Sequence, residues 1–294
     1  MLLHDVQKTI LMNSMIKKVS DSLSKLGASL ASVIKVVLLS KPTQKAAKCN
    51  EKEVVVLGNG PSLNKTISEH KDFLMARDRI AVNFAANAPI FFDLCPTGYV
   101  LADPHFFNGV STDPNVAKLW DNISSTTWEM TLYLPISQRK FALLANLKSN
   151  IKICFYNLTP VEGFKGLSQL IYRLGLGMPR PRNVLIPSIM LAINSGYHRV
   201  YVAGADHSWT QTLWVDDQNR VVSIQPHFYE DNESERKRVA TEYHKYPLHQ
   251  ILQSLYIAFR SYFDIADYAK SRNVEIINIT PESFIDAFLR MKLS

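Results

Sequence analysis

The chain has 294 residues, 47% of them hydrophobic, which suits a folded α/β protein with one main domain and an appendage. Its three cysteines, Cys49, Cys95 and Cys154, are odd in number and widely spaced, which excludes a disulfide framework and a zinc ribbon and favours a reducing cytoplasm. The net charge of +7 is concentrated in residues 1–50, so the nearly neutral remainder excludes a nucleic-acid-binding class.

The N-terminal segment carries apolar residues at alternating spacings of three and four. This pattern predicts a helix over residues 14–40 with a narrow apolar stripe and with lysine and serine opposite. The stripe consists of Ile16, Val19, Leu23, Leu26, Leu30, Val33 and Val37.

Three interpretations of this helix compete: packing on its own domain, self-association as a coiled coil, and contact with an anionic membrane surface. The lysines favour membrane contact or a homo-oligomer over simple packing. No run of eighteen apolar residues and no cleavage signal is found, so we expect neither a membrane span nor secretion. The expected location is the cytoplasm, peripheral on the inner membrane, with residues 1–50 as helix and linker and residues 51–294 as the α/β domain.

The main domain opens with a strand and a glycine turn. Residues 54–57 are apolar and mostly β-branched, which predicts a buried strand. The following residues, Gly58, Asn59, Gly60, Pro61 and Ser62, form a turn of the kind that holds phosphate between a strand and a helix, although they match neither the dinucleotide fingerprint nor a P-loop. The alternative is an ordinary tight turn.

Polar residues also follow the next two predicted strands. Asn83 ends the strand at 79–83, and Asp103 follows the strand at 99–102. Because parallel strands present their carboxyl ends at one edge of a sheet, we expect Asn59, Asn83 and Asp103 to share a site there.

The second half continues the alternation of helices and strands. We expect strands at 129–134, 151–156, 197–204 and 274–279, and helices at 66–76, 138–147, 183–194, 233–270 with a break before Pro247, and 281–291. Residues 164–182 are expected to form an ordered loop or lid, and 210–230 an excursion over the site. The fold class is therefore α/β, a mostly parallel, Rossmann-like sheet with helices on both faces.

Three sites in this half carry alternative interpretations. Arg180 and Arg182 are phosphate candidates or solvated loop charges. Asp206, at the end of a strand, either contacts a ligand or caps the next helix. A metal site built from Asp103, His105, Asp206 and His207 lacks ligand spacing and is not favoured.

Several motifs together resemble the bacterial sialyltransferases of glycosyltransferase family 42. They are GNGPSL at the first turn, Asn83, the Asp103-Pro104 pair followed by aromatic residues, SGYHRVYVAGAD and PESFIDAF. The first motif also resembles the flagellar motility accessory factors and the 6-hydroxymethylpterin diphosphokinases. The resemblance implies a single GT-A-like domain that transfers sialic acid from CMP-sialic acid to a glycan or glycolipid acceptor, with inversion and without a metal or other cofactor.

The resemblance also implies site residues. The turn from Gly58 to Ser62 would hold the nucleotide, Asn83 would hydrogen-bond the sugar nucleotide, and Asp103 takes the place of an asparagine in the family. Asp206 and Trp214 are further donor-binding candidates. The family's two phosphate-assisting tyrosines correspond to Ser208 and Trp214, so that assistance could instead come from Tyr229, His207 or an arginine.

The general base is a histidine in the family, and histidine suits the task because its pKa lies near working pH. No histidine stands at the matching position, Tyr256, so the candidates in order are His249, His244 and His227. Two other functions stay open: an ATP- and Mg²⁺-dependent diphosphokinase with Asp103 and Asp206 as metal ligands, and a non-catalytic factor that binds nucleotide sugars.

Overall fold

The computed structural model describes residues 2–43, 52–223, 228, 241 and 243–293, with side chains from residue 15 onward. Its central feature is a sheet of eight strands in the order β10-β9-β6-β1-β2-β3-β4-β5, and every adjacent pair is parallel. This arrangement confirms the predicted fold class. The strands are β1 (Glu53–Leu57), β2 (Asp78–Val82), β3 (Gly98–Val100), β4 (Met130–Pro135), β5 (Ile151–Tyr156), β6 (Arg199–Ala203), β9 (Glu275–Asn278) and β10 (Leu289–Arg290).

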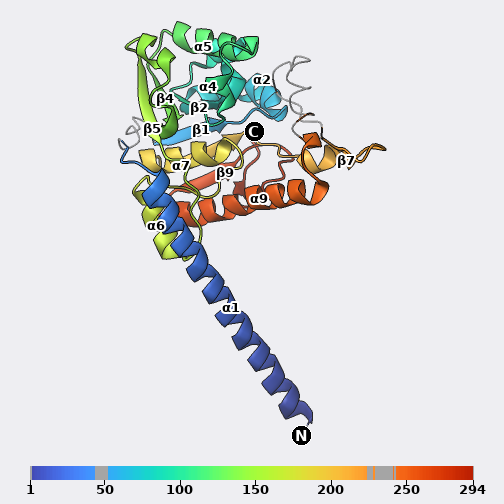
Figure 1. The fold of residues 1–294 in the computed structure, drawn as a ribbon. Coiled ribbons are helices and arrows are strands. Elements are labelled where there is room, and N and C mark those ends of the chain that lie inside the picture. Colours follow the sequence, from blue (N-terminus) through green and yellow to red (C-terminus); the bar gives the residue numbers. More distant parts are fainter. Residues whose placement is uncertain (1, 44–51, 224–227, 229–240, 242, 294) are drawn as a thin grey trace.

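The strands form because their residues are apolar on both faces, as a covered parallel sheet requires. In β1, Val54 and Val56 belong to one hydrophobic core and Val55 and Leu57 to the other. The first core contains α6 (Lys165–Arg173), α7 (Leu185–Ser195) and α9 (Leu248–Ser271); the second contains α2 (Ser62–Met75), α3 (Ile90–Leu94), α4 (His105–Asn108) and α5 (Pro114–Ser125). Figure 1 shows these two helical layers on opposite sides of the sheet.

The order of the strands places the crossover of the fold beside β1. The chain builds outward from β1 to β5 on one side and then returns to lay β6 against the other side of β1. In open α/β sheets, ligands bind outside the carboxyl ends of the strands at such a point of reversal.

Most predicted elements of the domain are confirmed within a few residues, including the end of α7, where Gly196 adopts a φ of 95°. The helix expected over 14–40 is part of α1 (Leu2–Leu39), and α9 begins directly after Pro247. The expected linker at 41–50 and the first part of the helix at 233–270 fall largely outside the described residues.

Three local predictions are wrong. Residues 165–173 form α6 rather than a loop, because Leu167 and Ile171 give this segment an apolar face that packs on the core. Only short 3-10 turns, η2 (Ile136–Gln138) and η3 (Ala142–Asn146), occupy the helix expected at 138–147. The segment 281–291 forms turns and β10, since its backbone bonds to the loop after β6: Phe284 N–H donates to the Asp206 carbonyl, 2.9 Å away.

The excursion after β6 contains one hairpin that the sequence pattern did not indicate. After the 3-10 turn η4 (Trp209–Thr212), β7 (Leu213–Val215) pairs antiparallel with β8 (Val221–Ser223). Figure 1 shows this hairpin extending from the body near the amino end of α9.

Helix α1 bears on the expectation that no segment spans a membrane. Within Met15–Leu39 an 18-residue window has a mean hydropathy of 1.6 and is 11% buried, so by length and composition this helix could cross a bilayer. The window is not an unbroken apolar run, but it holds at most two charged residues. Length and composition alone do not distinguish crossing a bilayer from lying on one.

Candidate functional site

The predicted site residues that follow strands lie together at the carboxyl edge of the sheet, as expected. Asn59, Asn83 and Asp103 follow the adjacent strands β1, β2 and β3, and Asp206 follows β6 on the other side of β1. Four consecutive strand ends of the sheet therefore present polar side chains to the region where the fold reverses.

The glycines of the first turn are required by contact with the loop after β6. Gly58 N–H donates to the Ala203 carbonyl at 2.7 Å, and Gly60 N–H donates to the Gly204 carbonyl at 2.8 Å. A Cβ on Gly60 would lie 1.9 Å from an oxygen of Asp206. The absence of side chains here thus permits two protein loops to touch, which is a structural reason for the glycines independent of any ligand.

Asp206 fills the anion position at the start of α2. Its Oδ2 accepts the Ser62 hydroxyl at 2.8 Å, and its Oδ1 lies 3.3 Å from the Ser62 N–H. A carboxylate at a helix N-terminus satisfies the free N–H groups and the positive end of the helix dipole. Asp206 therefore caps a helix, but it is α2, earlier in the chain, and not the next helix as expected. The cation that binds a substrate phosphate is then to be sought at other residues.

Two asparagines at the strand ends retain buried acceptor atoms without a partner among the described residues. Asn59 donates through Nδ2 to the Val82 carbonyl at 3.2 Å, while its Oδ1 accepts nothing. Asn83 has a left-handed φ of 50°, and its Oδ1 is likewise unpaired. Buried polar atoms normally have partners, so these two oxygens are candidates for donors supplied by a ligand.

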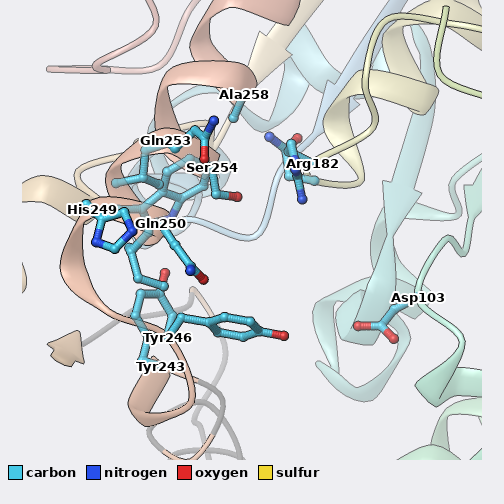
Figure 2. A pocket seen from close by; sticks show the side chains of 13 residues that line it. Asp103, Arg182, Tyr243, Tyr246, His249, Gln250, Gln253, Ser254 and Ala258 are labelled. Carbon is cyan, nitrogen blue, oxygen red and sulfur yellow. The ribbon is translucent and has the colours of Figure 1, made fainter. Parts of the chain in front are cut away.

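A cleft of about 930 Å³ opens at the same edge, between Asp103, the loop before α7 and the first turns of α9. Figure 2 shows Asp103 on one side, Tyr246 and Gln250 on the other, and Arg182 entering the space between them. Side-chain amides and aromatic rings make up much of the wall, together with one arginine and one aspartate. The lining residues are Asp103, Arg182, Asn183, Trp209, Tyr243, Tyr246, His249, Gln250, Ile251, Gln253, Ser254, Leu255 and Ala258.

The two arginines of the PRPRN segment have different roles. Arg180 bonds to Glu162, with Nε 2.8 Å and an NH2 nitrogen 2.7 Å from the same carboxylate oxygen, so it belongs to the structure. Arg182 is exposed in the cleft, and its guanidinium forms no hydrogen bond or ion pair with any residue in the described part of the chain. Of the pair, Arg182 is the one available to an anionic ligand.

Asn183, at the wall of the cleft, is held by a chain of buried hydrogen bonds. Its Oδ1 accepts from the Leu185 N–H and from the Tyr262 hydroxyl, both at 3.0 Å. The Tyr262 oxygen lies 2.6 Å from Nε2 of His207, which we assign as the donor because the single tyrosine proton points to Asn183. The Nδ2 group of Asn183 is left buried and unpaired among the described residues, and Asn183 lines the cleft.

His207 itself does not serve as a base or a phosphate ligand. It is buried, adopts a φ of 53°, and stacks on Trp209 with ring centres 4.0 Å apart. Burial lowers the pKa of His207 to about 3, so the ring is neutral at physiological pH. Its role is to hold Tyr262 and, through it, Asn183.

Of the three histidines proposed as bases, the structure brings one into the cleft. His249, in the first turn of α9, lines it; His244 is exposed and is not among the lining residues; His227 lies outside the described residues. Trp214 lies on β7, 45% exposed and outside the lining, whereas Trp209 forms part of the wall.

The described residues contain no group of three His, Cys, Asp or Glu side chains placed to hold a metal ion. Each of the four residues considered for one has a protein partner. His105 pairs with Asp113 at 2.8 Å, and Asp103 accepts from the His105 backbone N–H at 2.8 Å. His207 pairs with Tyr262, and Asp206 pairs with Ser62.

The sequence reasoning missed several cleft residues. The sequence marks none of Asn183, Trp209, Tyr246, Gln250 and Gln253 as candidates, although all five line the cleft. A usable signal existed for α9, since Gln250, Gln253 and Ser254 repeat at helical spacing opposite its apolar positions. No local signal marks Asn183, because its position depends on Tyr262, 79 residues away in the chain.

No known family model matches the chain, and no curated protein matches it. Among solved structures it is similar to the MAf glycosyltransferase from Magnetospirillum magneticum AMB-1, with 10% sequence identity and a TM-score of 0.48. That similarity covers 92% of this chain and 38% of the other, so this chain corresponds to little more than a third of that protein's length.

Proposed function

We propose that the chain is an inverting, metal-independent glycosyltransferase that uses a CMP-linked sugar, with sialic acid as the sugar and a surface glycan or glycolipid as the acceptor. The observation that carries the proposal is the composition of the cleft. It joins Arg182, which has no partner among the described residues, Asn183, whose amide nitrogen is buried and unpaired among them, and His249.

The charge of the cleft favours a donor with a single phosphate. Among the described lining residues Arg182 is the only permanently charged cation, and Asp103 is the only carboxylate. A diphosphate carries two negative charges close together and is usually neutralised by a metal ion or several basic groups. The phosphodiester of a CMP-sugar carries one negative charge, which one arginine matches. The carboxylate of sialic acid is a second, separate charge, for which the described lining offers the hydrogen-bond donors of Gln250, Gln253 and Ser254.

The remaining walls suit the neutral parts of such a donor. Gln250 and Gln253 offer amide donors and acceptors for sugar hydroxyls, and Trp209, Tyr243 and Tyr246 offer aromatic surface. Asn59 and Asn83 are not among the residues that line the cleft. Their unpaired Oδ1 atoms could accept from the amino and hydroxyl groups of a nucleoside, so nucleotide binding by these two residues stays a prediction.

The reaction follows from these positions. Nε2 or Nδ1 of His249 takes the proton of the acceptor hydroxyl while that oxygen bonds to the anomeric carbon from the face opposite the phosphate. The bond from the anomeric carbon to the phosphate oxygen breaks, and CMP leaves with the electron pair. Arg182 and the Nδ2–H group of Asn183 stabilise the charge that develops on the leaving phosphate.

The test is the release of CMP from CMP-sialic acid in excess EDTA, with water as the acceptor. We expect turnover by the full chain, a loss of about 10²-fold or more in His249→Asn, and wild-type turnover in His244→Asn. His244 is the matched control because it is an exposed histidine five positions away that does not line the cleft.

Two other results would replace the proposal. Magnesium-dependent release of AMP from ATP with a 6-hydroxymethylpterin as the diphosphate acceptor, and no turnover of CMP-sialic acid, would indicate the diphosphokinase. Saturable binding of CMP-sialic acid, with no turnover by the wild type or by either histidine variant, would indicate a non-catalytic nucleotide-sugar-binding factor.

A further inference from the structure

Helix α1 is attached to the body by its serine face, on which Val36 also packs against the hydrophobic core. The hydroxyl oxygen of Ser29 accepts the Phe164 N–H at 2.9 Å, and that of Ser32 accepts the Glu162 N–H and donates to the Glu162 carbonyl, both at 2.9 Å. Ser29 and Ser32 are buried, at 5% and 2% exposure. Figure 1 shows the carboxyl end of α1 beside α6 and the rest of the helix projecting away from the body.

The contact is close as well as polar. Gly163 has a φ of 119°, and a Cβ at this residue would lie 2.2 Å from the Ser29 hydroxyl. Beyond the helix end, the Ser40 hydroxyl bonds to Thr159 at 2.8 Å and to the Leu176 carbonyl at 2.6 Å. These contacts fix which face of α1 turns toward the domain.

The apolar side chains of α1 face solvent instead. At 100° per residue they occupy an arc of about 140° that runs from residue 15 to residue 38. A surface helix ordinarily packs its apolar stripe on the core and exposes its polar face, and α1 does the reverse. The arc consists of Met15, Ile16, Val19, Leu23, Leu26, Leu30, Val33, Ile34, Val37 and Leu38, all 41–73% exposed.

The charges on this stretch lie outside the arc. Lys17, Lys18, Lys25 and Lys35 all project from the remaining circumference, and Asp21 is the one acidic residue. Lysines beside a broad apolar face are typical of helices that lie on anionic lipid, where each contributes to attraction by the headgroups.

A second copy of the chain would cover this surface less completely. A two-helix seam buries residues that repeat every 3.5 positions, such as Leu26, Leu30 and Val33, and leaves the flank of the arc at Ile34 and Leu38 exposed. A lipid surface covers the whole arc.

The serine contacts also argue against a helix that crosses the bilayer. Crossing would carry the Glu162–Phe164 backbone, to which Ser29 and Ser32 are bonded, to the depth of the lipid chains. We infer that α1 lies in the plane of an anionic bilayer, with its apolar arc in the interface and its serine face on the domain. This inference concerns a different surface from the cleft and does not rest on the proposed function.

The test is the partition of the full chain onto vesicles of phosphatidylcholine with and without phosphatidylglycerol, measured by flotation. Leu30→Ser, at the centre of the arc, should lower partition about tenfold. Leu39→Ser is the matched control, because Leu39 is 59% exposed, against 58% for Leu30, but lies on the opposite side of the helix. The partition of the Leu39→Ser protein should differ less than twofold from that of the wild type. Lys35→Gln should lower partition about fivefold on anionic vesicles and leave neutral ones unchanged.

Three outcomes would overturn the inference. Equal effects of Leu30→Ser and Leu39→Ser would show that the arc does not face lipid. A dimer by light scattering without vesicle binding would assign the arc to a second copy. Resistance to alkaline carbonate, with the amino end shielded from protease added outside, would show a crossing helix.

Discussion

Acidification should destabilise the fold through His207. Burial lowers the pKa of His207 to about 3 in the folded protein, against about 6.5 in the unfolded chain. Below pH 6.5 His207 binds a proton in the unfolded state but not in the folded state. The contribution of His207 to the free energy of unfolding is therefore fully present above pH 6.5 and decreases as the pH drops toward 3. From about pH 7.5 to about pH 5, this one group should lower the free energy of unfolding by about 2 kcal/mol.

The assay is urea unfolding at both pH values for the wild type and for His207→Gln. Glutamine can still donate to Tyr262 through its amide but does not titrate, so groups other than residue 207 cancel in the difference between the two proteins. The drop in unfolding free energy on acidification should be about 2 kcal/mol smaller in the variant. An equal drop in both proteins would refute the burial of His207 and restore it as a candidate that contacts phosphate.

The remaining predictions concern the arginine pair and the glycine turn. Arg182→Gln should weaken CMP binding, measured by calorimetry, by about tenfold to a hundredfold without changing the free energy of unfolding. Arg180→Gln breaks the ion pair with Glu162, so it should leave CMP binding unchanged and lower the free energy of unfolding by about 1 kcal/mol or less. Equal effects of the two variants on CMP binding would contradict the division of roles. Gly60→Ala should lower the free energy of unfolding by at least about 1 kcal/mol, because the added Cβ would displace the Asp206 cap, and a variant as stable as the wild type in urea would contradict the close contact.

The sheet could be predicted from the sequence because its signals are local. Each central strand is an apolar run such as Val54–Leu57 that ends in a polar or glycine-rich turn, and the alternation with helices leaves few topologies. Where the prediction failed, distant contacts decided the structure. Residues 281–291 look helical in isolation, yet the Ser283 hydroxyl donates to the Ala205 carbonyl at 2.6 Å and holds this segment as turns.

The site could be predicted only in part, for the same reason. The positions of Asn59, Asn83 and Asp103 follow from their places at strand ends. The pairing of Asp206 with Ser62 and the orientation of Asn183 by Tyr262 join segments 144 and 79 residues apart, so no spacing in the chain indicates them. Arg180 and Arg182 are two positions apart and differ in role only because Glu162 lies next to one of them.

The most direct measurement is a thermal-shift comparison of CMP-sialic acid with ATP, each with EDTA or with Mg²⁺. A ligand that binds only the folded state stabilises it by about 2.7 kcal/mol at a hundred times its dissociation constant. If the cleft binds a donor with one phosphate through Arg182, CMP-sialic acid should raise the melting temperature equally in EDTA and in Mg²⁺. The Arg182→Gln variant should lose most of this shift. A shift produced by ATP alone, and only with Mg²⁺, would contradict it.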